Sequence, residues 1–121
     1  MKFKVGDLRV RQLRGIAASR GQHIGKVKLV QTVDELSKVE DGDVLVTKAT
    51  TPEFLSGIVK AGAVVTDRGG ITSHAAIVSR EFGKPCVVGC VEATFILHDN
   101  MIVEVDGTIG VVSYQQMLRK A

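Results

Sequence analysis

Residues 63–88 read AVVTDRGGITSHAAIVSREFGKPCVV, and this stretch decides the fold class. Residues 63–65 form a short apolar run that is typical of a buried strand. The spacing of apolar residues predicts a helix over 73–82, and Gly83 ends it. Residues 86–88 form a second apolar run. A strand, a helix and a strand in this order predict an α/β or α+β domain with a helix layer on a sheet.

The segments on both sides contain further helix and strand signals. Thr32 and Glu35 have the spacing of a capping box, which opens a short helix. Thr51 and Pro52 have the features of a second helix start. Alternating or wholly apolar runs predict strands over 25–30, 44–46, 101–105 and 110–114, with a hairpin turn at 106–107.

The length of 121 residues allows one compact domain. The chain has no Trp and few other aromatic residues, so its core is expected to consist of Val, Ile, Leu and Ala. Residues 1–14 have the weakest pattern. We expect them to be an N-terminal arm or linker remnant, with a single domain over 15–121.

Composition and charge limit the expected location and partners. No apolar run approaches the ~20 residues of a membrane-spanning helix, and the N-terminus lacks the apolar block of a secretory signal. Two cysteines are too few for a disulfide framework. We therefore expect a cytoplasmic protein without membrane contacts.

The net charge of +3 comes from the first 30 residues, which are rich in Lys and Arg. No aromatic pattern for base stacking accompanies these charges, so we do not expect nucleic acid as a partner. A solvated basic face is the simplest interpretation. Attraction of phosphorylated small molecules or of an acidic partner domain is the alternative.

The turn at Gly69 and Gly70 leads into the start of the helix beside His74. The first N–H groups of a helix lack intrahelical acceptors and carry the positive end of the helix dipole. Glycine lets the backbone approach an anion closely. The pattern therefore predicts a phosphate site, for which the expected phosphate-binding residues are Arg68, Gly69, Gly70, Thr72 and Ser73.

His74 is the residue in this segment that can carry a phosphoryl group covalently. Its ordinary pKa of about 6.5 leaves much of the imidazole unprotonated near neutral pH. Attack by one ring nitrogen on phosphorus gives a phosphoramidate, which passes its group on readily. The alternative is that His74 only helps to cap the helix.

His23 and His98 have no neighbours at ligand spacing, and we expect no metal site in this chain.

Residues 66–89, TDRGGITSHAAIVSREFGKPCVVG, resemble the phosphohistidine signature of phosphoenolpyruvate-utilising enzymes. This family includes pyruvate phosphate dikinase, phosphoenolpyruvate synthase and the first enzyme of the sugar phosphotransferase system. The likeness covers residues 15–114, through GIAAS (15–19), GDVLV (42–46), TP (51–52) and DGTIGV (106–111). Arg20 differs, because a proline is common there in the family.

The resemblance implies a three-layer β/β/α swivelling domain in which His74 is the phosphorylated, catalytic residue. It also implies that Thr72 matches a regulatory threonine of some members, and capping of the helix is the other role open to Thr72. The partners would be an ATP-binding domain or subunit and a phosphoenolpyruvate/pyruvate-binding domain or subunit. No cofactor is expected on this chain alone, and magnesium is expected at the partner domains. The alternative function is a non-catalytic regulatory or ligand-binding module of the same fold.

Overall fold

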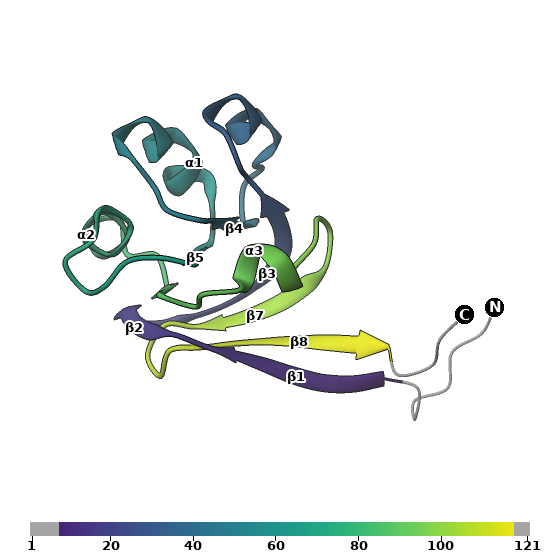
Figure 1. Ribbon diagram of the computed structural model, residues 1–121. Helices are drawn as coiled ribbons and strands as arrows, with labels where there is room; N and C mark the ends of the chain where they lie inside the picture. Colours follow the sequence, from purple (N-terminus) through teal and green to yellow (C-terminus); the bar gives the residue numbers. More distant parts are fainter. Residues whose placement is uncertain (1–7, 118–121) are drawn as a thin grey trace.

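The computed structural model describes residues 8–117, in which eight strands form one mixed sheet with short helices over part of it (Figure 1). The order of the strands across the sheet is β1-β8-β7-β3-β4-β5-β6-β2. The strands are β1 Leu8–Arg14, β2 Ile16–Ser19, β3 Gln22–Leu29, β4 Val44–Thr47, β5 Ala63–Thr66, β6 Cys86–Val88, β7 Ile102–Asp106 and β8 Val111–Met117. The helices are η2 Val33–Lys38, η3 Pro52–Phe54, α1 Leu55–Lys60, α2 His74–Glu81 and α3 Ala93–Ile96.

Strands β3, β4, β5 and β6 run parallel to one another and form the centre of the domain. The residues of β4, β5 and β6 are buried on both faces, as expected for parallel strands, whereas in β3 only Val27 is fully buried. In β4, Leu45 packs with the helices, whereas Val44 and Val46 pack on the opposite face. Each such side chain contributes about 1.5–3 kcal/mol through burial.

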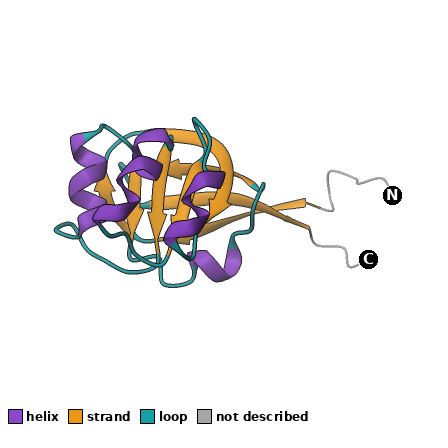
Figure 2. Cartoon of the chain, turned by 90° about the horizontal axis from the view of Figure 1, so that it is seen from above, coloured by secondary structure: helices purple, strands orange, loops and turns teal. Residues whose placement is uncertain are grey.

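Helices η2, α1 and α2 cover one face of these parallel strands (Figures 1 and 2). Strands β7, β8 and β1 pair antiparallel beyond β3, and the sheet curves so that they lie below the other face (Figure 1). Val103 and Val105 of β7 and Val112 of β8 join the apolar cluster there. These layers confirm the predicted α+β class and the β/β/α arrangement.

The first strand is a correction to the expected arm or linker remnant over 1–14. Residues 8–14 form β1, which pairs along its whole length with β8, from Leu8 opposite Met117 to Arg14 opposite Val111. Leu13 is buried in the core. The prediction missed this strand because its partner lies about a hundred residues further along the chain, as in the Arg11–Gln116 side-chain contact, 105 positions apart. Residues 1–7 lie outside the described residues.

Three smaller elements also differ from the sequence prediction. Strand β2 and the single-turn helix α3 were not predicted, because neither is long enough to show a period. The helix that begins after Thr32 is a 3₁₀ helix, although the Glu35 carboxylate does accept the Thr32 N–H at 3.1 Å. Within residues 8–117, no helix has both the length and the apolar character needed to cross a membrane.

Candidate functional site

The site lies where the parallel strands β4 and β5 end, because the carboxyl ends of parallel strands meet at one edge of a sheet. Backbone hydrogen bonds hold the loops after these strands together. The N–H of Asp67 donates to the Thr47 carbonyl at 3.1 Å, and the N–H of Arg68 donates to the Lys48 carbonyl at 2.9 Å. The loop after β4 is therefore fixed beside the loop that precedes α2.

The contact between His74 and Thr50 is the central feature of this site. His74 is the first residue of α2 and is partly exposed. Its Nδ1 atom lies 2.7 Å from Thr50 Oγ1, in the loop after β4. Within residues 8–117 no hydrogen bond engages Nε2. The imidazole is thus held by one nitrogen and presents the other.

Sequence reasoning left the partner of the second ring nitrogen of His74 open and did not single out Thr50. The signal that could have found Thr50 is its position just beyond a fully buried strand. A neighbouring parallel strand leads to His74, so a hydroxyl at this point is brought to the same sheet edge.

The N-terminal cap of α2 is Ser73. Its Oγ accepts the Ala76 N–H at 3.4 Å and donates to the Gly70 carbonyl at 2.7 Å. The Ser73 N–H donates to the same carbonyl at 3.0 Å. The Ser73 hydroxyl proton is therefore used in a hydrogen bond to the backbone. The N–H groups of the first helical turn that precede Ala76 remain available to bind an anion.

The backbone and the packing require glycine at only one of the two positions in the turn. Gly69 has φ +111°, and a Cβ there would lie 2.9 Å from Ser73 Oγ. Only glycine adopts this conformation readily. A Cβ at Gly70 would meet no atom within 4 Å. Packing therefore requires glycine at 69, whereas glycine at 70 keeps the space beside the turn open.

Arg68 and Thr72 are exposed near the start of α2. The structure gives the helix cap to Ser73, so capping, the alternative role considered for Thr72, is wrong. The backbone of Arg68 is fixed, since its carbonyl accepts the Thr66 hydroxyl at 2.6 Å. Its guanidinium forms no hydrogen bond or ion pair within residues 8–117.

The two cysteines are free and buried. Burial raises the pKa of the Cys86 thiol to about 11, and burial together with the nearby Asp67 carboxylate raises the pKa of the Cys90 thiol to about 12. Both remain protonated at neutral pH and are therefore poor nucleophiles.

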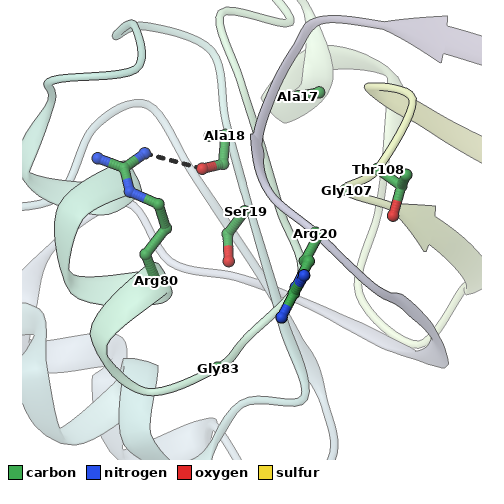
Figure 3. A pocket seen from close by; sticks show the side chains of 8 residues that line it. All are labelled: Ala17, Ala18, Ser19, Arg20, Arg80, Gly83, Gly107 and Thr108. Atoms are coloured by element: carbon green, nitrogen blue, oxygen red, sulfur yellow. Dashed lines mark hydrogen bonds between the residues drawn. The ribbon is translucent and has the colours of Figure 1, made fainter.

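A cavity of about 690 Å³ opens towards the C-terminal end of α2 (Figure 3). It is lined by Ala17, Ala18, Ser19, Arg20, Arg80, Gly83, Gly107 and Thr108. It includes none of the residues predicted for the phosphate site. In residues 8–117, no three side chains of His, Cys, Asp or Glu form a group that could hold a metal ion.

Comparison with known proteins identifies the family. A family model described as the mobile domain of PEP-utilising enzymes matches residues 39–110. A probable phosphoenolpyruvate synthase of Archaeoglobus fulgidus is 52% identical over 108 residues, which cover 89% of this chain and 14% of that protein. The phosphoenolpyruvate synthase of Pyrococcus furiosus is 52% identical over 100 residues, which cover 83% of this chain and 12% of that protein.

A solved structure is also similar to this chain in its fold. An NMR solution structure of an Enzyme I protein matches with a TM-score of 0.56 and 34% sequence identity, over 64% of this chain and 32% of that one. The chain spans 12–14% of the length of the two phosphoenolpyruvate synthases. This chain belongs to the mobile-domain family of phosphoenolpyruvate-utilising enzymes.

Proposed function

We propose that this chain carries a phosphoryl group on Nε2 of His74 and shuttles it between two partners. One partner binds ATP, and the other binds phosphoenolpyruvate or pyruvate. The observation that carries the proposal is the contact of 2.7 Å between Thr50 Oγ1 and His74 Nδ1, which leaves Nε2 as the unengaged nitrogen at the start of α2.

The proposed transfer uses the lone pair of Nε2. With the ring proton on Nδ1, Nε2 attacks phosphorus and the bond from phosphorus to the donor oxygen breaks, so that the donor leaves with the electron pair of that bond. Return of the group reverses these steps. A hydroxyl can accept a hydrogen bond from a protonated Nδ1 or donate one to a bare Nδ1. Thr50 can therefore hold the ring in the same orientation before and after transfer.

Backbone donors would stabilise the bound phosphoryl group. The first N–H groups of α2 and the positive end of its dipole are the expected contacts, and the open space beside Gly70 gives access. The exposed guanidinium of Arg68 forms no hydrogen bond or ion pair among the described residues and could pair with phosphoryl oxygens. The phosphate-binding roles of Gly69, Thr72 and Ser73 remain part of this proposal; for Ser73, the hydroxyl would exchange its hydrogen bond to the Gly70 carbonyl for one to a phosphoryl oxygen.

The remaining catalytic groups are assigned to the partners. Phosphoryl transfer from a nucleotide needs metal ions and charge-neutralising groups, so we propose that magnesium binds at the partner domains. The purified chain is then expected to show no turnover of ATP or phosphoenolpyruvate by itself. A cytoplasmic location is also proposed, and the two buried free thiols support a reducing compartment.

The alternative is a non-catalytic regulatory or ligand-binding module of the same fold. A binder has no need of a nucleophilic nitrogen, whereas the His74 ring is fixed with Nε2 unengaged. Labelled phosphoenolpyruvate or ATP separates the two functions when both partner domains and magnesium are supplied. A carrier acquires acid-labile, alkali-stable label at His74 and loses it in His74→Ala. A ligand-binding module stays unlabelled, and label on another residue would contradict the proposal.

A further inference from the structure

We infer that Arg80 is a positioning residue for the phosphohistidine site, an inference that rests on the proposed function. It fixes the peptide between Ile71 and Thr72, and so determines where the loop in front of His74 presents its N–H groups. Arg80 lies in the last turn of α2, one helix length from His74, and has no contact with the reacting nitrogen.

The Arg80 guanidinium bridges two segments that are far apart in sequence. Nη1 donates to the Ala18 carbonyl of β2 at 2.8 Å (Figure 3), and Nη2 donates to the Ile71 carbonyl at 2.7 Å. A guanidinium is planar and its donors have a fixed geometry. The two carbonyls are therefore held in one orientation relative to each other, and the position of Ile71 depends on that of Ala18.

Ala18 is available to Arg80 because β2 has an irregularity at this residue. Ala17 pairs with Val87 and Ser19 pairs with Cys86, so Ala18 is the extra residue of a β-bulge against β6. A bulged residue is left out of the ladder, and such bulges often redirect groups beside functional sites. The Ala18 carbonyl thus accepts a side chain instead of a neighbouring strand.

The bulge is a rigid attachment point. Ala18 and Ser19 are both buried. The hairpin turn between β7 and β8 presses against this segment, since a Cβ at Gly107 would overlap the Ser19 carbonyl oxygen. Arg80 therefore connects the exposed loop to a buried and closely packed segment of the sheet edge.

Ser73 fixes the Gly70 carbonyl, but within residues 8–117 the peptide between Ile71 and Thr72 has no hydrogen bond other than that from Arg80. The Ile71 side chain is 58% exposed, Thr72 is exposed, and the preceding Gly69 and Gly70 are conformationally permissive. The peptide bond is trans and planar, so the Thr72 N–H points opposite to the Ile71 carbonyl. With that carbonyl bound to Arg80, the N–H is directed away from Arg80 and is free to meet an anion.

The test uses phosphoramidate, a small donor that phosphorylates histidine as ammonia leaves, so that no partner domain is needed. Arg80→Ala is compared with the parent and with Arg20→Ala, a control that removes the same charge from the wall of the same cavity, where Arg20 makes no hydrogen bond within residues 8–117. We expect Arg80→Ala to slow His74 phosphorylation about ten- to hundredfold, and Arg20→Ala to match the parent. The Thr72 amide resonance should shift only in Arg80→Ala.

Rescue distinguishes a positioning role from loss of folding. Free guanidinium ion, well below denaturing concentration, should restore much of the rate in Arg80→Ala, whereas the same concentration of sodium chloride should not. Equal rates in Arg80→Ala and the parent, or an unshifted Thr72 amide, would overturn the inference. Failure of the parent to label at His74 when both partner domains, magnesium and labelled phosphoenolpyruvate or ATP are supplied would instead reject the proposed function, and the Thr72 amide would still report on Arg80.

Discussion

Thr50 Oγ1 lies 2.7 Å from His74 Nδ1, and this contact joins the loop after β4 to the first residue of α2. The two residues lie after neighbouring parallel strands. Thr50 comes just after β4, and β5, which pairs with β4, leads through the Gly69–Gly70 turn to His74. The hydroxyl determines which ring nitrogen is presented.

Replacing Thr50 tests that role. In Thr50→Val the Nδ1 atom loses its partner at nearly constant side-chain volume, so the ring can rotate and change tautomer. We expect His74 phosphorylation to fall about tenfold, which corresponds to about 1.4 kcal/mol, within the usual range for a lost hydrogen bond. Thr50→Ser retains the hydroxyl and should remain within about threefold of the parent. Nitrogen NMR of the His74 ring should show a mixed tautomer in the valine variant; a single tautomer there would contradict the assignment.

The two glycines of the turn give a matched pair of variants. Gly69 has φ +111° and lies against Ser73, so Gly69→Ala is expected to lower the free energy of unfolding by about 1–3 kcal/mol. A Cβ at Gly70 meets no protein atom, and Gly70→Ala should change stability by less than about 0.5 kcal/mol. The added methyl group would nevertheless occupy the open space beside the turn where the phosphate is proposed to bind, and we expect slower phosphorylation of His74. Urea unfolding and phosphoramidate labelling measure the two effects; equal destabilisation of the two variants would contradict the structure.

The structure also predicts a pH dependence of stability at the turn between β7 and β8. The side-chain amide of Gln22 and the backbone N–H groups of Ile109 and Thr108 hold the pKa of Asp106 below its ordinary range. A lowered pKa in the folded state stabilises the fold above the unfolded value of about 3.9, and this contribution disappears as the pH falls through the folded value.

Asp106→Asn should therefore be less stable than the parent at pH 7, and the difference should shrink well below pH 4. Urea unfolding of both proteins at the two pH values provides the measurement. Glu104→Gln, which removes a neighbouring exposed carboxylate from β7, serves as the control. A difference that persists unchanged in acid would show that the Asp106 carboxylate charge does not stabilise this turn.

Thr72 offers a test of local charge beside His74. Its side chain is exposed and the helix cap belongs to Ser73, so Thr72 is accessible to modification. A phosphate there would bring nearly two negative charges and would compete for the backbone donors proposed for the His74 phosphoryl group. Thr72→Glu should greatly reduce His74 labelling with an unchanged circular dichroism spectrum, whereas Thr72→Val should retain it. A glutamate variant that labels as fast as the parent would exclude this mechanism.

Much of the central fold was readable from local sequence. Strands β4, β5 and β6 are continuous apolar runs, and helix α2 begins after a capping serine and ends before Gly83. The sequence signals for these elements each lie within a few residues. Those signals correctly predicted the strand, turn and helix that place His74 at the edge of the sheet.

The features that were missed depend on distant partners. Strand β1 is defined by pairing with β8, and the partner of the Arg80 guanidinium in β2 is 62 positions away. The Thr50–His74 contact spans 24 positions and requires β4 and β5 to be adjacent and parallel. No pattern within either segment encodes these pairings, so the second ring nitrogen of His74 could not be assigned from sequence.

The most direct test of the central claim identifies the nitrogen that becomes phosphorylated. The chain, labelled with ¹⁵N in its histidine rings, is treated with phosphoramidate and examined by ³¹P and ¹⁵N NMR, with His74→Ala as the control. We predict one phosphohistidine, with phosphorus coupled to Nε2 of His74, and no such signal in the variant. Phosphorus coupled to Nδ1, or an equal signal from His23 or His98 in the variant, would contradict the account.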